Sequence, residues 1–344
     1  MTIEMTPIGR TAGEILSWSR ATVDGPLRDA VGQLPGALRQ IAGYHFGWLT
    51  EDGEPARGDA GKAIRPALAL LSSCAVGGDA EAAIPAAVAV ELVHNFSLLH
   101  DDVMDKDELR RHRPTAWKVF GTAEAILAGD ALLALASRYV ARTAFNPGTA
   151  VEWLGESVVK LCLGQADDIS FEHRDNVEVE ECWGMAGNKT GELLGVSCAL
   201  GALAGGADIT TAHLMRGFGE HLGQAFQLTD DLLGIWGDPA QTGKPAHSDL
   251  HNRKKSLPVV AALRSGTSYG DQLAELYLHT PTDECGNLGH LADLIERAGG
   301  RAWAEQNAST EAELALDFLD SASSDETASA GLRELAHLMI GRKY

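Results

Sequence analysis

The sequence predicts an all-α fold, and three observations support that prediction. Runs of β-branched residues bounded by Asn-Gly turns, which are typical of hairpins, are nearly absent. Ala, Leu, Glu and Arg dominate instead, and apolar residues recur every three or four positions. Short runs rich in Gly, Pro, Ser or Asp separate these stretches. The clearest helical stretches are, in order, 63–74, 82–100, 122–143, 151–171, 214–236 and 311–319.

Helix-breaking residues place the ends of these stretches. Residues 77–79 follow the first stretch, the Asn-Pro-Gly at 146–148 separates the third from the fourth, and Gly205-Gly206 precedes the fifth. Residues 237–245 follow the fifth. The chain has no internal repeat and no linker between two compositions, so we expect a single domain over residues 1–344.

Composition narrows the possible partners and compartments. The 344 residues carry a formal net charge of −20, which disfavours nucleic acids and anionic membrane surfaces because like charges repel. The five scattered cysteines form no C-x-x-C pair, no secretion signal is visible, and no apolar stretch reaches the roughly twenty residues of a membrane span. We therefore expect a cytoplasmic protein with reduced thiols, without nucleic-acid partners and without membrane insertion.

Acidic residues cluster at the end of the apolar stretch 82–100. Asp101 and Asp105 are four residues apart and share one face of a helix, where the two carboxylates repel each other unless a cation lies between them. Oxygen ligands of this kind suit Mg²⁺, which also binds substrate phosphates. For this cluster alone, a solvated acidic turn is the alternative interpretation.

A second cluster strengthens the metal hypothesis. Asp230 and Asp231 also end a long apolar stretch, and apolar residues on both sides are unusual for a solvent-facing helix. Two such clusters on different helices can face each other and hold Mg²⁺ ions between them.

Basic residues stand close to the acidic clusters in the sequence. Arg110 and Arg111 follow the first cluster, and the spacing of Lys62 and Arg65 puts both cations on one helix face, where they can clamp a phosphate. Further basic residues are Lys189, Lys244, Lys254 and Lys255. Each alone is also compatible with an ordinary surface cation.

These motifs together resemble the trans-isoprenyl diphosphate synthases of the polyprenyl synthetase family, in particular the geranylgeranyl diphosphate synthase type. The matching motifs are, in order, Gly61-Lys62-Ala63-Ile64-Arg65-Pro66, Glu91-Leu92-Val93-His94, the first aspartate cluster with Arg110-Arg111, Gly164-Gln165 with Asp168, Lys189-Thr190, Phe226-Gln227 with the second aspartate cluster, Gly243-Lys244-Pro245 with Ser248-Asp249-Leu250, and Lys254. The resemblance implies one large helical bundle of the isoprenoid synthase type with a central cavity.

The resemblance also implies a reaction and its partners. Isopentenyl diphosphate would condense with dimethylallyl, geranyl or farnesyl diphosphate to give a short-chain all-trans product, in a homodimer with three Mg²⁺ ions. The residues that bind Mg²⁺ directly would be Asp101, Asp105 and Asp230. Asp102 and Asp231 would hold metal-bound waters or contact the metal ligands without binding the metal themselves. The allylic diphosphate would contact Arg110, Lys189, Lys244 and Lys254, and isopentenyl diphosphate would contact Lys62, Arg65, His94 and Arg111. Thr190 and Gln227 would lie beside the reacting carbons.

Two positions bear on metal affinity and product length. Gly234 stands where the family usually has the last Asp of the second cluster, so we expect reduced Mg²⁺ affinity rather than loss of activity. Phe96, five residues before Asp101, stands where the family often limits chain length, although it also fits an ordinary core position. Because Ser97 is small, we expect a twenty-carbon product, geranylgeranyl diphosphate, rather than a fifteen-carbon one.

Three other functions remain open at this point. A class I terpene cyclase shares the fold and the ionisation step but needs no isopentenyl diphosphate site, so Lys62, Arg65, His94 and Arg111 argue against it. A non-catalytic synthase subunit would be expected to lose its aspartates, whereas the first cluster is intact. A helical protein with an acidic Mg²⁺ or Ca²⁺ site would leave the basic motifs without a role.

Overall fold

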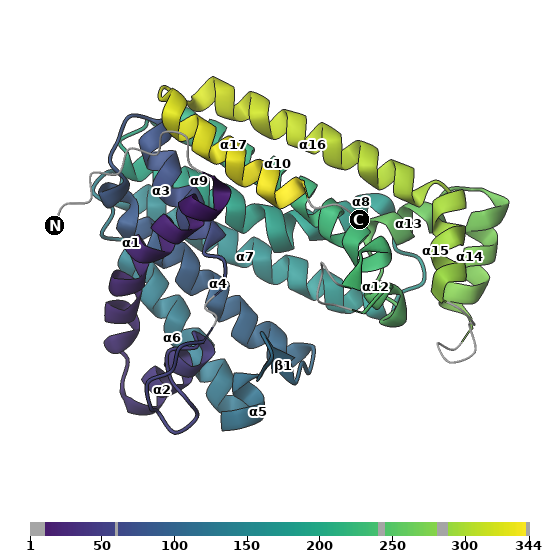
Figure 1. Ribbon diagram of the computed structural model, residues 1–344, viewed down its shortest axis with the longest axis horizontal. Helices are drawn as coiled ribbons and strands as arrows, with labels where there is room; N and C mark the ends of the chain where they lie inside the picture. Colours follow the sequence, from purple (N-terminus) through teal and green to yellow (C-terminus); the bar gives the residue numbers. More distant parts are fainter. Residues whose placement is uncertain (1–10, 59–60, 240–244, 281–287, 342–344) are drawn as a thin grey trace. The chain divides into compact units, whose positions relative to one another are not determined.

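The structure is a computed structural model that describes residues 11–58, 61–239, 245–280 and 288–341 (Figure 1). Its regular elements are almost all helical, which confirms the predicted fold class. The described elements are α1 (Ala12–Gly32), α2 (Gly36–His45), α3 (Ile64–Ala75), η1 (Ala80–Ala83), α4 (Ile84–Met104), β1 (Leu109–Arg110), β2 (Arg113–Pro114), α5 (Ala116–Phe120), α6 (Thr122–Val140), α7 (Pro147–Glu172), α8 (Val179–Ala186), η2 (Gly187–Gly191), α9 (Glu192–Ala204), α10 (Ile209–Trp236), α12 (Ser248–His251), α13 (Leu257–Leu263), α14 (Ser268–Leu278), α15 (Leu288–Arg297), α16 (Gly300–Ala322) and α17 (Glu326–Ile340).

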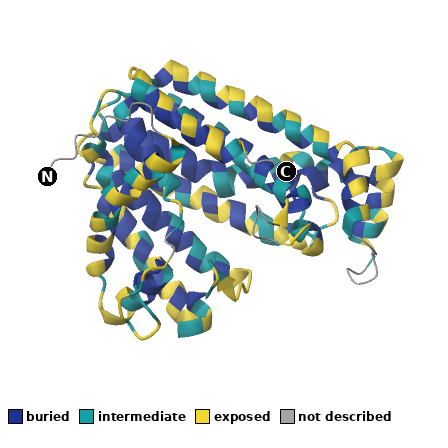
Figure 2. Ribbon diagram, viewed as in Figure 1, coloured by how far each residue is buried: buried dark blue, intermediate teal, exposed yellow. Residues whose placement is uncertain are grey.

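The chain forms two compact units, and the first comprises residues 1–158, 196–216 and 319–335. Its core includes α3 and α4, which are buried over residues 66–73 and 86–93 (Figure 2). Helix α6 comes close to α4 because Gly129 has no side chain: a Cβ there would run into the imidazole of His100. The Nε2 of His100 lies 3.0 Å from the Ile126 carbonyl oxygen. This packing holds the end of α4 that carries the first aspartate cluster.

The stretch Ala80–Met104 is the part of the described chain that is long and apolar enough to cross a membrane. Within the protein, however, 72% of its most apolar window is buried. Its apolar surface is covered by other helices of the same unit, α6 and α3 above all. The stretch is therefore a core helix of this fold.

The second compact unit comprises residues 159–195, 217–318 and 336–344. One of its apolar clusters joins the end of α10 to α12, α13, α14 and α15. Another joins α7, α8, α10, α13 and α16. Helix α10 contributes to both clusters, so its segment around Asp230 is firmly held.

Helices α10 and α16 are also joined by a polar contact in this unit. The Nδ1 of His221 lies 2.7 Å from Oε2 of Glu311, and its ring stacks on Phe318 with centroids 5.2 Å apart. Phe318 fits there because Gly217 has no Cβ. The hydrogen bond that the His221 ring donates to Glu311 raises the pKa of His221, against the opposing effect of burial.

We expect this pair to make stability depend on pH. A raised histidine pKa stabilises the fold fully below the unfolded-state pKa of about 6.5, and the stabilisation is lost as pH rises through the folded-state pKa. His221→Gln is therefore expected to cost about 1 kcal/mol near pH 6 and much less near pH 9. Denaturant unfolding of wild type and variant at both pH values measures this, with exposed His251→Gln as control. An equal stability difference at the two pH values would contradict the assignment.

Candidate functional site

The first acidic cluster, Asp101, Asp102 and Asp105, lies at the carboxyl end of α4 in the first unit. The backbone N–H of Asp105 donates to the Asp101 carbonyl oxygen at 2.8 Å, so the helical turn continues through the cluster. Asp101 and Asp105 are therefore one turn apart on the same side of α4. At this negative end of the helix dipole, two carboxylates are unfavourable unless a cation offsets them.

Asp102 differs from its two neighbours because its side chain is buried. Its Oδ1 accepts hydrogen bonds from Arg110, at 2.7 Å from Nε and 2.6 Å from Nη2. Burial raises the pKa of the Asp102 carboxyl, and Arg110 opposes that rise. The Oδ2 atom is buried without a hydrogen-bond partner. Asp102 thus orients Arg110 and leaves one acceptor beside the cluster.

A tight hairpin positions the arginines that follow this cluster. Arg110 pairs with Arg113 across β1 and β2, and the two turn residues, Arg111 and His112, have φ values of 51° and 61°. Positive φ at both central residues is the conformation of a two-residue hairpin turn that matches the strand twist. Arg113 donates to the carbonyl oxygens of Tyr44 and Leu49, both at 3.2 Å, which ties the hairpin to the end of α2 and to the segment after it.

Arg111 lies against the loop that carries Lys62. The expectation that Lys62 and Arg65 share a helix face is wrong, because Ala63 is left-handed and α3 begins only at Ile64. Gly61, with φ of 85°, passes so close to Arg111 that a Cβ there would lie 2.6 Å from the Nη2 atom. A side chain at position 61 would therefore be strained and would also displace Arg111. The absence of a side chain at Gly61 brings Arg111 and the Lys62–Arg65 segment together within one unit.

Polar groups of α3 and α4 lie beside this loop, with Glu91 buried and Arg65 and His94 half-buried. Burial lowers the pKa of Arg65 and of His94, and nearby Arg65 and Arg111 lower the pKa of His94 further, to well below its usual value. Burial raises the pKa of Glu91, which Arg65 opposes. His94 is thus neutral at pH 7, and Nε of Arg65 is a buried donor without a hydrogen-bond partner. An anion at this place would satisfy that donor.

His45 lies close to the arginine hairpin. It lines a small cleft together with Asp102, Arg110, Arg111 and Arg113. Its pKa is lowered to about 3 by burial and by the charges of Arg111 and Arg110. Neutral His45 adds no charge to the cleft, which leaves the arginines as its cations.

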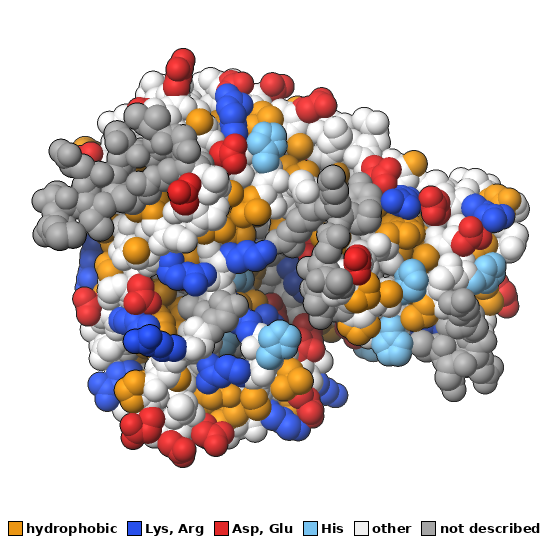
Figure 3. All heavy atoms as spheres, in the orientation of Figure 1, with side chains coloured by type: hydrophobic (Ala, Val, Ile, Leu, Met, Phe, Trp, Pro, Cys, Tyr) orange, Lys and Arg blue, Asp and Glu red, His pale blue; other side chains and the backbone are white. Residues whose placement is uncertain are grey.

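Basic side chains also gather over the α1 and α2 part of the first unit (Figure 3). A cleft of about 540 Å³ there is lined by Arg20, Arg28, Arg57 and Lys62, together with Trp48 and with Asp24, which pairs with Arg28. In a chain of net charge −20, such a local basic region is suited to an anionic small molecule.

In the second unit, one turn of π-helix, η2, presents Lys189 and Thr190. Glycines allow the neighbouring helices to approach this turn. A Cβ at Gly164 of α7 would lie 2.5 Å from the backbone nitrogen of Lys189, and a Cβ at Gly223 of α10 would lie 3.0 Å from the backbone nitrogen of Gly191. Single π-helical turns within α-helices are frequent at functional sites.

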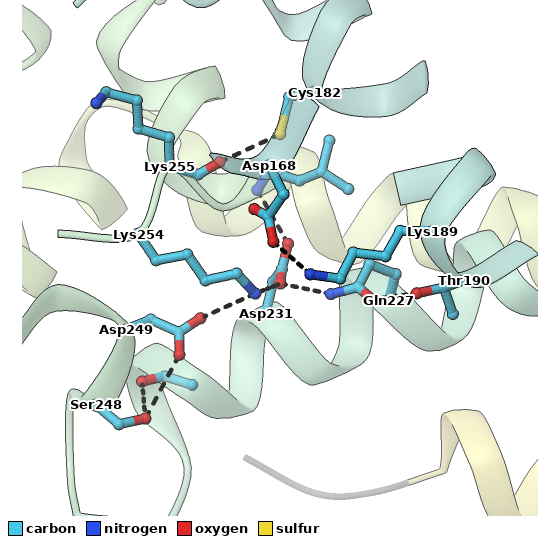
Figure 4. A network of polar contacts seen from close by, with 12 residues as sticks. Asp168, Cys182, Lys189, Thr190, Gln227, Asp231, Ser248, Asp249, Lys254 and Lys255 are labelled. Atoms are coloured by element: carbon cyan, nitrogen blue, oxygen red, sulfur yellow. Dashed lines mark hydrogen bonds and ion pairs between the residues drawn. The ribbon is translucent and has the colours of Figure 1, made fainter. Parts of the chain in front are cut away.

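These approaches bring Lys189, Thr190, Gln227 and Asp231 of the second unit into polar contacts with one another or with Asp168 (Figure 4). Lys189 pairs with Asp168 at 2.5 Å. Thr190 donates to Gln227 at 2.8 Å, and Gln227 in turn donates to Oδ1 of Asp231 at 2.9 Å. These contacts link η2 to α7 through Lys189 and to α10 through Thr190 and Gln227.

Both carboxyl oxygens of Asp231 accept hydrogen bonds from the protein. Besides Gln227, Oδ1 accepts from Nζ of Lys254 at 3.1 Å, and Oδ2 accepts from the backbone N–H of Leu257 at 3.0 Å. Asp231 is 3% exposed, which leaves little room for another ligand. Its geometry is that of a residue that positions Lys254 and Gln227.

Lys254 is surrounded by acidic residues. Burial by itself lowers the pKa of its ammonium group, but Asp231, Asp249, Asp168 and Asp230 together raise that pKa above the usual value. Lys254 therefore stays cationic throughout the physiological pH range and can bind an anion.

The donor set fits Mg²⁺. Among the residues that the structure describes, no three His, Cys, Asp or Glu side chains come together as a metal-binding group. Mg²⁺ typically uses one or two protein carboxylates together with waters and substrate phosphates. Asp101 and Asp105 on one side of α4 match that requirement.

The structure thus divides the sequence-predicted residues between the two units. The first unit holds Lys62, Arg65, His94, Phe96, Asp101, Asp102, Asp105, Arg110 and Arg111, and the second holds Lys189, Thr190, Gln227, Asp230, Asp231 and Lys254. Lys244 lies outside the described residues. Sequence reasoning assigned no role to His45, Asp168 or Asp249. His45 carries no motif signal, whereas Asp168 and Asp249 stand within matched motifs.

Comparison with known proteins identifies the family. The family model for polyprenyl synthetase matches residues 48–291. The chain is 43% identical over 336 residues to the (2E,6E)-farnesyl diphosphate synthase of Mycobacterium tuberculosis (strain ATCC 25618 / H37Rv), and 41% identical over 331 residues to a geranylgeranyl diphosphate synthase of that strain; each match covers 96% of this chain and 93% of the relative.

A solved structure agrees with these relatives. The crystal structure of a polyprenyl synthetase from Streptomyces coelicolor A3(2) is 48% identical, with a TM-score of 0.90, and the match covers 95% of this chain and 99% of that one. The resemblance predicted from the motifs is thereby confirmed, and the chain belongs to the polyprenyl synthetase family.

Proposed function

We propose that this protein is a trans-prenyltransferase that condenses isopentenyl diphosphate with an allylic diphosphate to give a short-chain all-trans prenyl diphosphate. The family and its two synthase relatives support the reaction class. The single observation that carries the proposal is the pairing of Asp101 and Asp105 with an arginine hairpin fixed to the same helix end through Asp102 and Arg110. This arrangement suits a cation and a diphosphate bound together.

The site residues divide into three groups by proposed role. Asp101, Asp105 and Asp230 hold Mg²⁺, with three ions expected, while Asp102 and Asp231 position Arg110 and Lys254. The allylic diphosphate is bound by Arg110, Lys189, Lys244 and Lys254. Isopentenyl diphosphate is bound by Lys62, Arg65, His94 and Arg111.

The reaction needs no protein nucleophile. Mg²⁺, when bound, supplies positive charge that stabilises the departing diphosphate. The allylic C–O bond breaks, the alkene of isopentenyl diphosphate forms the new C–C bond, and a proton leaves the coupled chain for the released diphosphate. Arg110 and Lys254 are fixed by Asp102 and Asp231 before substrate arrives, so little reorganisation is needed as charge develops. The oxygens of Thr190 and Gln227 direct their dipoles at the allylic cation.

Incubation with isopentenyl diphosphate, each allylic diphosphate in turn and Mg²⁺ tests this function. We expect consumption of both substrates and a prenyl diphosphate extended by five-carbon units. A cyclic hydrocarbon formed from the allylic substrate alone would show a terpene cyclase instead. Turnover only after addition of another synthase chain would show a non-catalytic subunit.

We further propose geranylgeranyl diphosphate as the main product. The relatives include both farnesyl and geranylgeranyl diphosphate synthases, so they do not distinguish a fifteen-carbon from a twenty-carbon product. The proposal therefore rests on the residues before Asp101. Ser97 lies one helical turn before Asp101 on the same side of α4 and is small. Phe96 is 5% exposed, and its ring meets that of His100 edge-on at 4.7 Å.

Phe96→Ala is expected to lengthen the products by at least one isoprene unit, because we propose that its ring limits the space for the growing chain. Ser97→Phe is expected to shorten them to fifteen carbons. Chromatography of the dephosphorylated products measures both effects, and Phe145→Ala, at an exposed aromatic residue, serves as control. An unchanged product spectrum in Phe96→Ala would remove this residue from the assignment.

A homodimer, a single domain over residues 1–344 and a cytoplasmic location complete the proposal. They follow from the family resemblance and the composition, and each stays a prediction.

A further inference from the structure

The second acidic cluster lacks one carboxylate that the first cluster has. The first reads Asp101, Asp102 and, three residues on, Asp105. The second reads Asp230, Asp231 and, three residues on, Gly234. Gly234 follows Asp230 by one turn of α10, the same offset that separates Asp105 from Asp101.

The space beside Gly234 is filled by a carboxylate from another element. A Cβ at position 234 would lie 2.5 Å from both carboxyl oxygens of Asp249, so a side chain there would have to displace this carboxylate. Asp249 belongs to the short helix α12, and Figure 4 shows its carboxylate turned toward Lys254. Gly234 and Asp249 thus fit together as a pair.

Three contacts hold α12 against the end of α10. The Nδ1 of His247 lies 2.6 Å from the Ile235 carbonyl oxygen, and the Ser248 hydroxyl donates to the Gly234 carbonyl oxygen at 3.4 Å. Leu250 is fully buried in the apolar cluster that contains Ile235. The Asp249 carboxylate is therefore held in place by the residues on both sides of it.

The Asp249 carboxylate also lies beside a positive charge, the ammonium group of Lys254. Its Oδ2 lies 3.8 Å from Nζ of Lys254, which is also 3.1 Å from Oδ1 of Asp231. The side chain of Asp249 is 13% exposed, so its charge acts in surroundings that screen it less than water does. Lys254 is thus shared between Asp231 on α10 and Asp249 on α12.

We propose that Asp249 completes the second acidic cluster, and that its carboxylate takes the place of a side chain at position 234. The proposal rests on the function proposed above, because it assigns Asp249 to the Mg²⁺ and diphosphate end of that site. It also changes the expectation for Gly234: the glycine makes room for a carboxylate, and Gly234→Asp would force two carboxylates into one space.

A swap of the two positions tests the proposal with three variants. Asp249→Asn removes the charge, Gly234→Asp crowds the site, and the double variant Gly234→Asp with Asp249→Gly moves the carboxylate back to α10. Asp238→Asn, at an exposed acid just beyond α10, is the matched control. Binding of Mn²⁺ in the presence of inorganic diphosphate, followed by electron paramagnetic resonance, gives a readout that does not require turnover.

We expect Asp249→Asn and Gly234→Asp each to weaken Mn²⁺ binding about tenfold, and the double variant to recover most of the loss. The Mg²⁺ concentration for half-maximal activity should shift in parallel, and the control should leave both quantities unchanged.

If Asp249→Asn lowers the melting temperature but leaves Mn²⁺ affinity unchanged, Asp249 is merely structural and the proposal is wrong. Failure of the double variant to recover binding would also overturn it. A wild-type protein that binds Mn²⁺ through Asp249 but makes no product would overturn the proposed function alone.

Discussion

Asp101→Asn is expected to lower kcat by about a thousandfold while the protein stays folded. Asp101 lies at the end of α4 on the side it shares with Asp105, where we propose that Mg²⁺ and the allylic diphosphate are bound. The amide keeps the size of the side chain but removes the charge that holds the cation, so the departing diphosphate loses its main stabilisation. Initial rates over a range of Mg²⁺ concentrations measure the loss, and thermal melting verifies the fold.

Asp107→Asn is the matched control for this variant. Asp107 is exposed, lies two residues beyond Asp105 and carries the same charge, so a general effect of net charge would appear in both variants. We expect Asp107→Asn to retain kcat within about twofold. An Asp101→Asn enzyme with wild-type kcat and Mg²⁺ dependence would show that the first cluster does not bind the catalytic metal.

Asp231→Asn is expected to destabilise the protein by about 3 kcal/mol and to lower kcat as well. The two Asp231 oxygens accept from Gln227, Lys254 and the backbone N–H of Leu257. An asparagine amide would turn one acceptor into a donor facing other donors, and Lys254 would lose a buried partner. Equilibrium denaturation measures the stability loss.

A comparison with Asp230→Asn separates the two neighbouring aspartates. We expect Asp230→Asn to alter Mg²⁺ dependence with a stability loss below about 1 kcal/mol, because its proposed role is to bind metal rather than to hold Lys254. Equal stability in the Asp231→Asn variant and the wild type would show that the hydrogen bonds of Asp231 contribute nothing to the fold. The roles assigned to Asp230 and Asp231 would then have to be reconsidered.

The sequence predicted the helical segments better than their ends. Predicted stretch 63–74 is Ile64–Ala75 in the structure, where Gly77 has the positive φ typical of a residue just past a helix. Helix α10 begins at Ile209, five residues before the predicted start, because the Asp208 carboxylate accepts from the Thr211 backbone N–H at 2.7 Å. Helix α16 begins at Gly300 rather than at 311, because Ala304 and Ala308, one turn apart, are buried in the apolar cluster that also contains Leu228.

Local motifs predicted which residues form the candidate site but not how they are arranged. No residue signal indicates the hairpin at Arg110–Arg113, because Arg111-His112 is not one of the Asn-Gly, Asp-Gly or Gly-Gly pairs that mark this turn. The π-helical turn at Lys189 depends on glycines contributed by other helices, Gly164 and Gly223. The meeting of Asp249 and Gly234 depends on tertiary packing of α12, which lies beyond the reach of sequence spacing.

The central claim is that Asp101, Asp105 and Asp230 act on one diphosphate. The most direct test is a crystal structure with Mg²⁺, isopentenyl diphosphate and a non-ionisable thio analogue of an allylic diphosphate. We expect metal ions that link carboxylates of both aspartate clusters to the diphosphate of the same analogue molecule. A diphosphate whose metal ions are bound by one cluster only, with the other cluster turned to solvent, would contradict it.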